Sequence, residues 1–297
     1  MKVKVAVLGD IMLDRYFEAD VKKSPEYDGN CVVNPRLIRQ VPGGAGNVAM
    51  CLARMGIPTA IVGIHGSEEV DRIFDETQYL LNKTIMLPPA LCRKDRYLHK
   101  EEILTRIDID PDPEFFRQFD LISKYLIREL DCNIVITSDY NKGFLSEDVL
   151  STLVGRFHTW IADPKKVFYD AYECEEIIVK PNSVEALDLT STDNVLDAIT
   201  KLAEWTPGRV VVTDGENPIL FNDETIIGKV NVPRHRPRTV IGAGDVMTAV
   251  LAAGALEGWS LRKSLKKAII ACQKMMSQVP GNTLDKDSWN HIVTEVT

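Results

Sequence analysis

Short apolar runs that end in polar residues alternate along the chain with segments of helical periodicity. The runs predict buried strands at 3–8, 59–63, 134–137, 159–162, 177–179 and 210–213. Apolar residues recur at helical spacing over 46–55, 146–157, 194–205 and 261–277, so these segments are predicted helices. Strands that alternate with amphipathic helices favour an α/β fold, with a mainly parallel sheet covered by helices on both faces.

Polar residues follow five of the predicted strands. They are Asp10, Asp139, Asp163, Asn182 and Asp214. A single residue of this kind is usually a turn or helix-cap residue. Because parallel strands end at the same edge of a sheet and ligands collect beyond that edge, the five together predict a binding crevice.

Two segments interrupt the alternation, at about 15–41 and 84–110. They are polar and charged, with β-prone patches such as 31–33 and 106–109. We expect them to form a small sheet that covers the crevice as a lid; the alternative is two irregular surface excursions. No linker separates two similar halves, so residues 1–297 are predicted to form a single domain.

Composition narrows the class of protein. The net charge of −8 argues against nucleic acid or an anionic membrane as the partner, and no apolar run is long enough to span a bilayer. The densest basic cluster, 234–238, is usually a solvated loop; a role in holding nucleotide phosphates is the alternative. Six scattered cysteines form no CxxC pair, which favours reduced thiols and a cytoplasmic location.

The glycine-bearing turn Gly242-Ala243-Gly244-Asp245 runs directly into an apolar helical segment. Unpaired N–H groups and partial positive charge at a helix N-terminus suit an anion. A carboxylate beside them can accept a proton from a substrate hydroxyl, so the motif fits phosphoryl transfer to an alcohol. The competing interpretation is an ordinary helix start with an aspartate in its capping turn.

A second glycine-rich turn spans 41–47 and contains Gly43, Gly44 and Asn47. Its glycines allow close approach of the backbone to a hydroxyl-rich ligand, and the amide of Asn47 can both donate and accept. Residues 44–49 also match the dinucleotide pattern G-x-G-x-x-A formally. That motif should follow a strand, whereas Pro42 and a charged stretch precede this turn, so a dinucleotide enzyme is not favoured.

Asn182 and Glu185 lie three residues apart at the start of a helical segment. This spacing is that of a capping box. It also suits contact to magnesium and phosphates through the water that Mg²⁺ tends to keep. Spacing favours capping over metal binding.

Four motifs occur in an order that resembles the PfkB, or ribokinase-like, family of carbohydrate kinases: 9–10, 43–47, 182–185 and 242–245. Further stretches at 9–16, 42–50, 106–108, 138–143 and 163–165 are similar to the heptose-7-phosphate kinase branch. The resemblance implies a Rossmann-like domain with a β lid, ATP and Mg²⁺ as cofactors, and a sugar or sugar phosphate as substrate. Phosphorylation of D-glycero-D-manno-heptose 7-phosphate at its 1-hydroxyl is the favoured reaction. In many bacteria that kinase is fused to an adenylyltransferase, and a stand-alone kinase is expected here.

The resemblance also implies residue roles. Asp245 would be the catalytic base, and the backbone at Gly242, Ala243 and Gly244 would form the anion hole. Substrate contacts would come from Asp14, Arg15, Lys22, Gly43, Gly44, Asn47, Arg106, Asp139 and Lys142, with Arg15, Lys22, Arg106 and Lys142 as partners of a substrate phosphate. Nucleotide contacts would come from Lys165, Asn182, Glu185, Thr213, Asp214, Gly215 and Asn282. Asn182 and Glu185 would hold magnesium through water, and the lid would pair two chains into a homodimer.

The chain departs from the family pattern before the catalytic motif, where Thr239-Val240-Ile241 replaces Asp-x-Thr. The carboxylate that helps to bind a monovalent cation in the family is therefore missing, which argues against activation by potassium. The alternatives to a heptose kinase are another PfkB kinase for a sugar or nucleoside, and a non-catalytic protein that binds sugar or nucleotide with the same fold.

Overall fold

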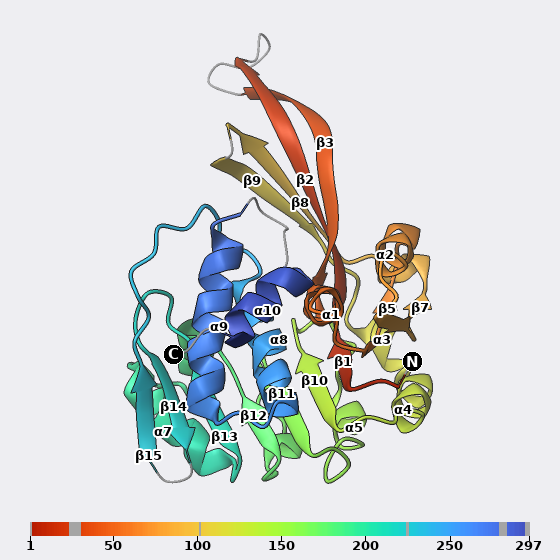
Figure 1. Ribbon diagram of the computed structural model, residues 1–297. Helices are drawn as coiled ribbons and strands as arrows, with labels where there is room; N and C mark the ends of the chain where they lie inside the picture. The colour runs from red at the N-terminus through yellow and green to blue at the C-terminus, as the bar shows by residue number, and fades with distance from the viewer. Residues whose placement is uncertain (1, 24–30, 101, 224–225, 279–283, 295–297) are drawn as a thin grey trace.

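The computed structural model describes residues 2–23, 31–100, 102–223, 226–278 and 284–294, and within these ranges a nine-stranded sheet forms the centre of the molecule (Figure 1). Its strands, in spatial order, are β15 (Ile226–Val230), β14 (Ile219–Asp223), β13 (Arg209–Val212), β12 (Ile177–Val179), β11 (Thr159–Asp163), β10 (Ile134–Ser138), β1 (Val5–Gly9), β4 (Thr59–Val62) and β6 (Leu80–Asn82). Neighbours from β13 to β6 are parallel, and β14 and β15 add an antiparallel edge. The predicted α/β fold is confirmed.

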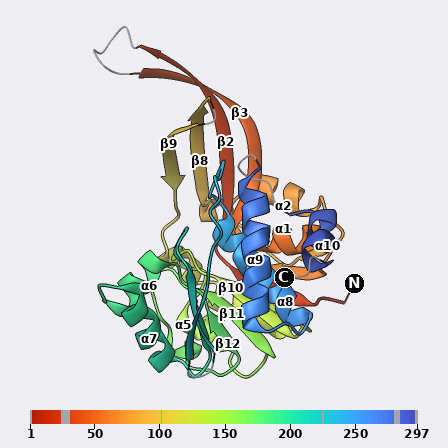
Figure 2. The ribbon, with the colours of Figure 1, turned by 60° about the vertical axis from the view of Figure 1, so that its left-hand side comes forward.

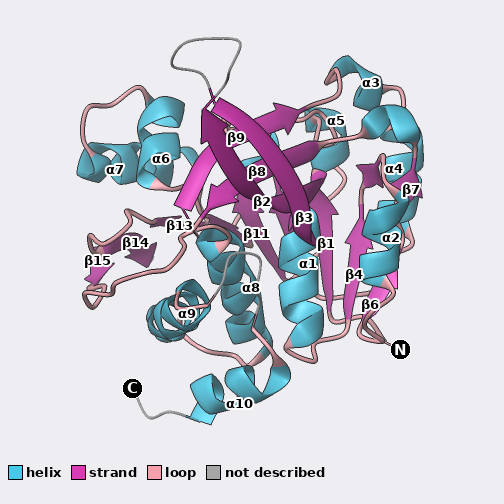
Figure 3. Cartoon of the chain, turned by 90° about the horizontal axis from the view of Figure 1, so that it is seen from above, coloured by secondary structure: helices cyan, strands magenta, loops and turns pink. Residues whose placement is uncertain are grey.

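The central strands bury both faces because alternate residues point to opposite sides of the sheet. In β1, Val5 and Val7 belong to one apolar core, whereas Ala6 and Leu8 belong to another. The first core packs under α1 (Ala45–Arg54), α2 (Glu68–Phe74), α8 (Ala243–Leu256), α9 (Leu261–Met276) and α10 (Lys286–Thr294). The opposite face carries α3 (Glu114–Arg117), α4 (Asp120–Arg128), α5 (Glu147–Leu150), α6 (Ser183–Thr190) and α7 (Val195–Trp205) (Figure 3).

A separate four-stranded sheet projects from the main domain (Figures 1 and 2). Its order is β3 (Cys31–Gly44), β2 (Ile11–Lys23), β8 (Arg93–His99) and β9 (Glu102–Ile109). The predicted small sheet therefore exists, although it begins at residue 11 and does not include 84–92. Those residues instead contribute β7 (Ile85–Met86), which pairs with β5 (Ile64–His65), and the 3₁₀ turn η1 (Pro88–Ala90).

One helix is much shorter than the apolar spacing predicts. The segment 146–157 contains only the four-residue α5, and turns follow it. Leu153 and Arg156 donate their backbone N–H groups three residues back, as in a 3₁₀ turn, and Gly155 adopts φ 66°. A positive φ interrupts the α-helical ladder, so the helix cannot continue through this position.

The strand ends meet where the crevice is predicted. Strands β1, β10, β11, β12 and β13 are neighbours, and the five polar residues lie at or just beyond their carboxyl ends. The small sheet rises from the same edge, because β1 passes through Asp10 directly into β2. Within the described parts of the chain, no helix is both long and apolar enough to cross a membrane.

Candidate active site

Asp245 lies in the first turn of α8, at the carboxyl edge of the main sheet. The turn before it is tight because the N-cap Gly242 adopts φ 85°, which a glycine tolerates at little cost. Only 5% of Asp245 is exposed, whereas Gly244 beside it is open to solvent. The arrangement places a buried carboxylate next to an accessible helix N-terminus, as the sequence predicts.

Both carboxylate oxygens of Asp245 accept a hydrogen bond. The amide of Asn47 donates from α1 to Oδ2 at 2.6 Å, and the hydroxyl of Tyr140 donates to Oδ1 at 3.0 Å. Burial raises the pKa of Asp245 to about 6, although these two hydrogen bonds favour the ionised form and lower it. Asp245 is therefore mainly ionised at neutral pH, yet its pKa lies close enough to pH 7 for proton transfer.

The loop that carries Tyr140 is held by Asp10. The buried carboxylate of Asp10 accepts backbone N–H groups from Tyr140 at 2.8 Å, Lys142 at 3.0 Å and Phe144 at 3.3 Å. The polar residue after β1 thus folds the loop after β10. Asp139 shapes the start of the same loop by accepting the N–H of Asn141 at 2.7 Å.

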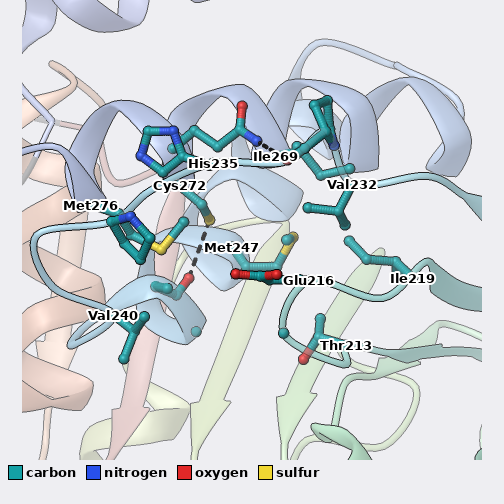
Figure 4. Close-up of a pocket in the computed structure, with 16 residues that line it drawn as sticks. Thr213, Glu216, Ile219, Val232, His235, Val240, Met247, Ile269, Cys272 and Met276 are labelled. Atoms are coloured by element: carbon teal, nitrogen blue, oxygen red, sulfur yellow. Dashed lines mark hydrogen bonds between the residues drawn. The ribbon is translucent and has the colours of Figure 1, made fainter.

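Two cavities adjoin the start of α8. The first, of about 210 Å³, is mainly apolar and lies between the 213–219 turn, α8 and α9 (Figure 4). Its walls include Val232, Met247 and Ile269, with His235 from the basic cluster at one side (Figure 4). The second, of about 250 Å³, is polar and charged. Because Thr213 and Gly244 line both cavities, a ligand with an apolar part and an anionic part can occupy them together.

Two lysine–carboxylate pairs line the polar cavity. The Nζ atom of Lys180, buried to all but 2%, lies 3.0 Å from Asp163 Oδ2. Burial lowers the pKa of Lys180, but the charges of Asp163 and Glu185 outweigh it and hold the pKa above its ordinary value. The Nζ atom of Lys165 lies 2.5 Å from Glu185 Oε1. The cavity therefore presents two ammonium groups with fixed partners.

Asn182 and Glu185 form the predicted capping box. The side chain of Asn182 accepts the N–H of Glu185 at 2.9 Å, and Glu185 Oε2 accepts the N–H of Asn182 at 2.8 Å. Both residues line the polar cavity, so capping holds them in place there. Thr213 and Gly215 line the apolar cavity, whereas Asp214 accepts a local hydrogen bond from Asn217. Asn282 lies outside the described residues.

The small sheet presents one face toward Asp245. Asp14 and Tyr16 alternate along β2 and lie beside Lys94 and Arg96 of β8, which lie beside Asp108 and Arg106 of β9. We call these six residues the inner face. Asp14 pairs with Arg96 at 3.1 Å, and a side chain at Gly43 would begin 3.0 Å from the Asp14 carboxylate. The charge of Asp245 acts on Tyr16, and that of Asp14 acts on Tyr140, so the inner face borders the site.

The four cations expected to bind a substrate phosphate do not lie together. Arg106 is on the inner face, where its Nε lies 2.8 Å from Asp108. Arg15 lies on the opposite face and pairs with Asp95 through two contacts, of 2.7 and 2.6 Å. Lys22 is near the far end of β2 beside Asp20, and Lys142 is paired with Asp110.

Sequence reasoning missed Tyr140, Lys180, Lys94 and Arg96. Strand alternation could have found the last two. Because successive residues of a strand point to opposite faces, Arg15 cannot share a face with Asp14. In a strand at 93–99, Lys94 and Arg96 lie on the same face. The segment 41–47 is not a turn: residues 41–44 end β3 of the small sheet, and α1 begins at Ala45. A strand therefore does run into this segment, contrary to the sequence-based expectation.

Comparison with known proteins gives the site its context. Residues 154–283 match the pfkB family carbohydrate kinase model, which covers the capping box and the start of α8. The matched residues thus carry a PfkB-family domain. A bifunctional protein HldE of Gluconobacter oxydans is 27% identical over 96% of this chain, and a D-beta-D-heptose 7-phosphate kinase of Bordetella bronchiseptica is 29% identical over 84%. The chain spans 63% of the former protein and 83% of the latter.

Solved structures of PfkB-type kinases share the fold. Phosphofructokinase-2 of Escherichia coli superposes with a TM-score of 0.75 over 98% of both chains, at 20% identity. A ribokinase of Arabidopsis thaliana, solved with ribose and ATP, gives a TM-score of 0.70 over the full length of both chains, at 16% identity. At these identities the likeness shows the fold alone, which is ribokinase-like.

Proposed function

We propose that this protein transfers the γ-phosphoryl group of ATP to a hydroxyl of a sugar or sugar phosphate. The observation that carries the proposal is the position of Asp245. It is a buried carboxylate at an open helix N-terminus, between a cavity suited to a nucleotide and a face suited to a sugar. The match of residues 154–283 to the pfkB family carbohydrate kinase model supports the same reaction class.

In the proposed step Asp245 accepts the proton of the substrate hydroxyl. The hydroxyl oxygen forms a bond to the γ-phosphorus while the bond from that phosphorus to the β–γ bridging oxygen breaks, and ADP leaves. Backbone N–H groups at Gly242, Ala243 and Gly244 stabilise the charge on the transferring group, for which the Ala243 N–H leaves its 3.3 Å contact with the Val240 carbonyl. The small sheet excludes water, which would otherwise compete with the sugar hydroxyl.

The charged cavity fits the triphosphate of ATP with Mg²⁺. Lys165 and Lys180 supply positive charge to the polar cavity. Thr213 and Gly215 line the adjoining apolar cavity, where the adenine ring of ATP would lie. Both oxygens of Glu185 already have partners, and no cluster of three metal-binding side chains occurs among the described residues. These donors suit an ion held mainly by water and phosphate, with Asn182 and Glu185 as its outer contacts. Bound magnesium would neutralise phosphate charge.

D-glycero-D-manno-heptose 7-phosphate is the favoured substrate, with its 1-hydroxyl as acceptor. The support is the likeness to heptose kinases and the inner face, where Lys94, Arg96 and Arg106 carry positive charge beside Asp14 and Asp108. Arginine and lysine are suitable partners for a sugar phosphate. Asp14, Gly43, Gly44 and Asn47 would contact the sugar hydroxyls. A homodimer through the small sheet belongs to the same proposal, and a cytoplasmic location stays a prediction.

The first test is ADP release with ATP and Mg²⁺ over heptose 7-phosphate, fructose phosphates, ribose, fructose and adenosine. Turnover confined to heptose 7-phosphate is expected. Asp245→Asn should lower the rate by a factor on the order of a thousand or more, because the base is lost, while ATP still binds by calorimetry.

The matched control is Asp188→Asn, which removes an exposed carboxylate on α6 and should retain full activity. Turnover of another substrate in the panel would support a kinase but reject heptose 7-phosphate as its substrate. A chain that binds ATP but releases no ADP with any substrate would be a binding protein.

A further inference from the structure

The Asp245 carboxylate is held from both sides before any ligand arrives. Asn47 donates to one oxygen from α1, and Tyr140 donates to the other from the loop after β10. Asn47 also belongs to the proposed sugar site, but the proposed reaction assigns nothing to Tyr140. Its hydroxyl nevertheless contacts the proposed base directly.

Three contacts fix the direction of the Tyr140 hydroxyl. Asp10 accepts the backbone N–H of Tyr140 at 2.8 Å, which holds the start of the loop against β1. The ammonium of Lys165 lies 5.0 Å from the centre of the Tyr140 ring, over its face. A side chain at Gly44 would come within 3.4 Å of the same ring, so the end of β3 packs against it. The hydroxyl is thereby aimed at Asp245.

The electrostatic surroundings of Asp245 come from five elements. The titratable groups that interact electrostatically with Asp245 are Tyr140 after β10, Asp163 at the end of β11, Lys180 after β12, Tyr16 on β2 and Cys51 on α1. Asp163 disfavours the ionised form of Asp245, and Lys180 favours it. Tyr140 is the titratable group that donates a hydrogen bond to the carboxylate itself. Burial, with the charge of Asp245, raises the pKa of Tyr140 well above 10, so the phenol stays protonated and remains a donor.

We propose that Tyr140 is a positioning residue for Asp245. It orients the carboxylate toward the sugar hydroxyl and keeps it ionised, so that the base is ready when the substrate binds. A carboxylate has about four acceptor sites, so the hydrogen bonds from Tyr140 and Asn47 leave room for the substrate hydroxyl. The inference rests on the proposed function of Asp245 as base.

Tyr140→Phe tests the proposal because it keeps the ring under Lys165 and removes only the hydroxyl. The acid limb of the kcat/KM profile against pH should move up by about one pH unit, since the ionised carboxylate loses a donor. At pH 8 or above, kcat should be lower by a factor on the order of ten, with KM for ATP unchanged. Tyr169→Phe is the control: it removes a hydroxyl that donates to the Leu145 carbonyl at 3.2 Å, and its profile should match wild type.

A direct titration separates this proposal from the proposed function. In protein labelled with ¹³C at aspartate carboxyls, the resonance absent from Asp245→Asn should titrate at about 6 in wild type and at higher pH in Tyr140→Phe. If the pKa of the Asp245 resonance rises in Tyr140→Phe but the wild-type protein has no kinase activity, the hydrogen bond from Tyr140 does keep Asp245 ionised, and the proposed function is rejected. Active enzyme whose acid limb and Asp245 resonance do not move in a folded Tyr140→Phe variant would overturn the role of Tyr140.

Discussion

At the scale of single residues, Gly44 joins the small sheet to the helix that carries Asn47. It adopts φ 59°, and a Cβ there would lie 2.4 Å from the Asp10 carbonyl oxygen. Gly44→Ala should therefore lower the free energy of unfolding by about 3 kcal/mol or more, through backbone strain and this clash. Urea denaturation measures the change.

Gly155→Ala is the matched control for Gly44→Ala. Gly155 has a similar φ of 66°, but a Cβ there would meet no described atom within 4 Å. Its cost should be that of the left-handed backbone alone, about 1 kcal/mol. Equal losses in the two variants would show that the contact with Asp10 is unimportant.

The sequence could predict the residues whose role depends on the local backbone. The glycines before Asp245, and Asn182 with Glu185, act through turn and cap geometry within a few residues, and the structure contains both features. Tyr140 and Lys180 matter because of contacts 105 and 17 residues away along the chain. A pattern in one segment does not encode such contacts, since they arise only when strands assemble in a particular order.

At the scale of elements, the Lys180–Asp163 pair links β12 to β11 at the carboxyl edge. Removing one partner of a buried pair leaves the other charge uncompensated. Lys180→Met should therefore lower the free energy of unfolding by about 3–5 kcal/mol, measured by urea denaturation at neutral pH.

The exposed pair between Lys124 and Asp148, with a similar distance of 3.1 Å, provides the comparison. Lys124→Met should cost less than about 1 kcal/mol because water already screens this pair. If Lys180→Met proves equally mild, the two strands do not depend on the ion pair.

Strand and helix positions were mostly predictable because apolar periodicity reports burial directly. The helix predicted over 146–157, of which only four residues are helical, shows the limit of apolar periodicity as a signal. Leu150, Leu153 and Phe157 are all buried, so the apolar spacing is real, but tight turns bury them as well as a helix would. The small sheet was located only approximately, because its charged residues obscure the alternation.

At the scale of the whole molecule, the face of the small sheet that points away from Asp245 carries exposed apolar side chains beside the Arg15–Asp95 pair. We call this the outer face; it includes Phe17 stacked on Tyr97, with Leu37 beside Phe17, and Ile107 and Ile109 on β9. Leu37 and Ile107 are 44% and 49% exposed. An apolar surface of this kind is typical of an interface.

The expected outcome is a homodimer in which two outer faces meet, measured by sedimentation velocity at micromolar concentrations. Ile107→Asp should give monomers because it places a charge within the interface. Ile226→Asp, at an exposed position on β15 away from the small sheet, should leave the dimer intact. A wild-type chain that sediments as a monomer would contradict the interface.

The continuous path from β3 into α1 has a consequence for how such enzymes diversify. Asn47 stands three residues beyond the last residue of β3, so changes in the paired ends of β2 and β3 would disturb the base as well as the sugar site. The strands β8 and β9 contribute the cations of the inner face without entering α1. New substrate specificities should therefore arise most readily through substitutions on β8 and β9. A mutant library confined to those strands should change the substrate that is accepted and leave the contact between Asn47 and Asp245 intact.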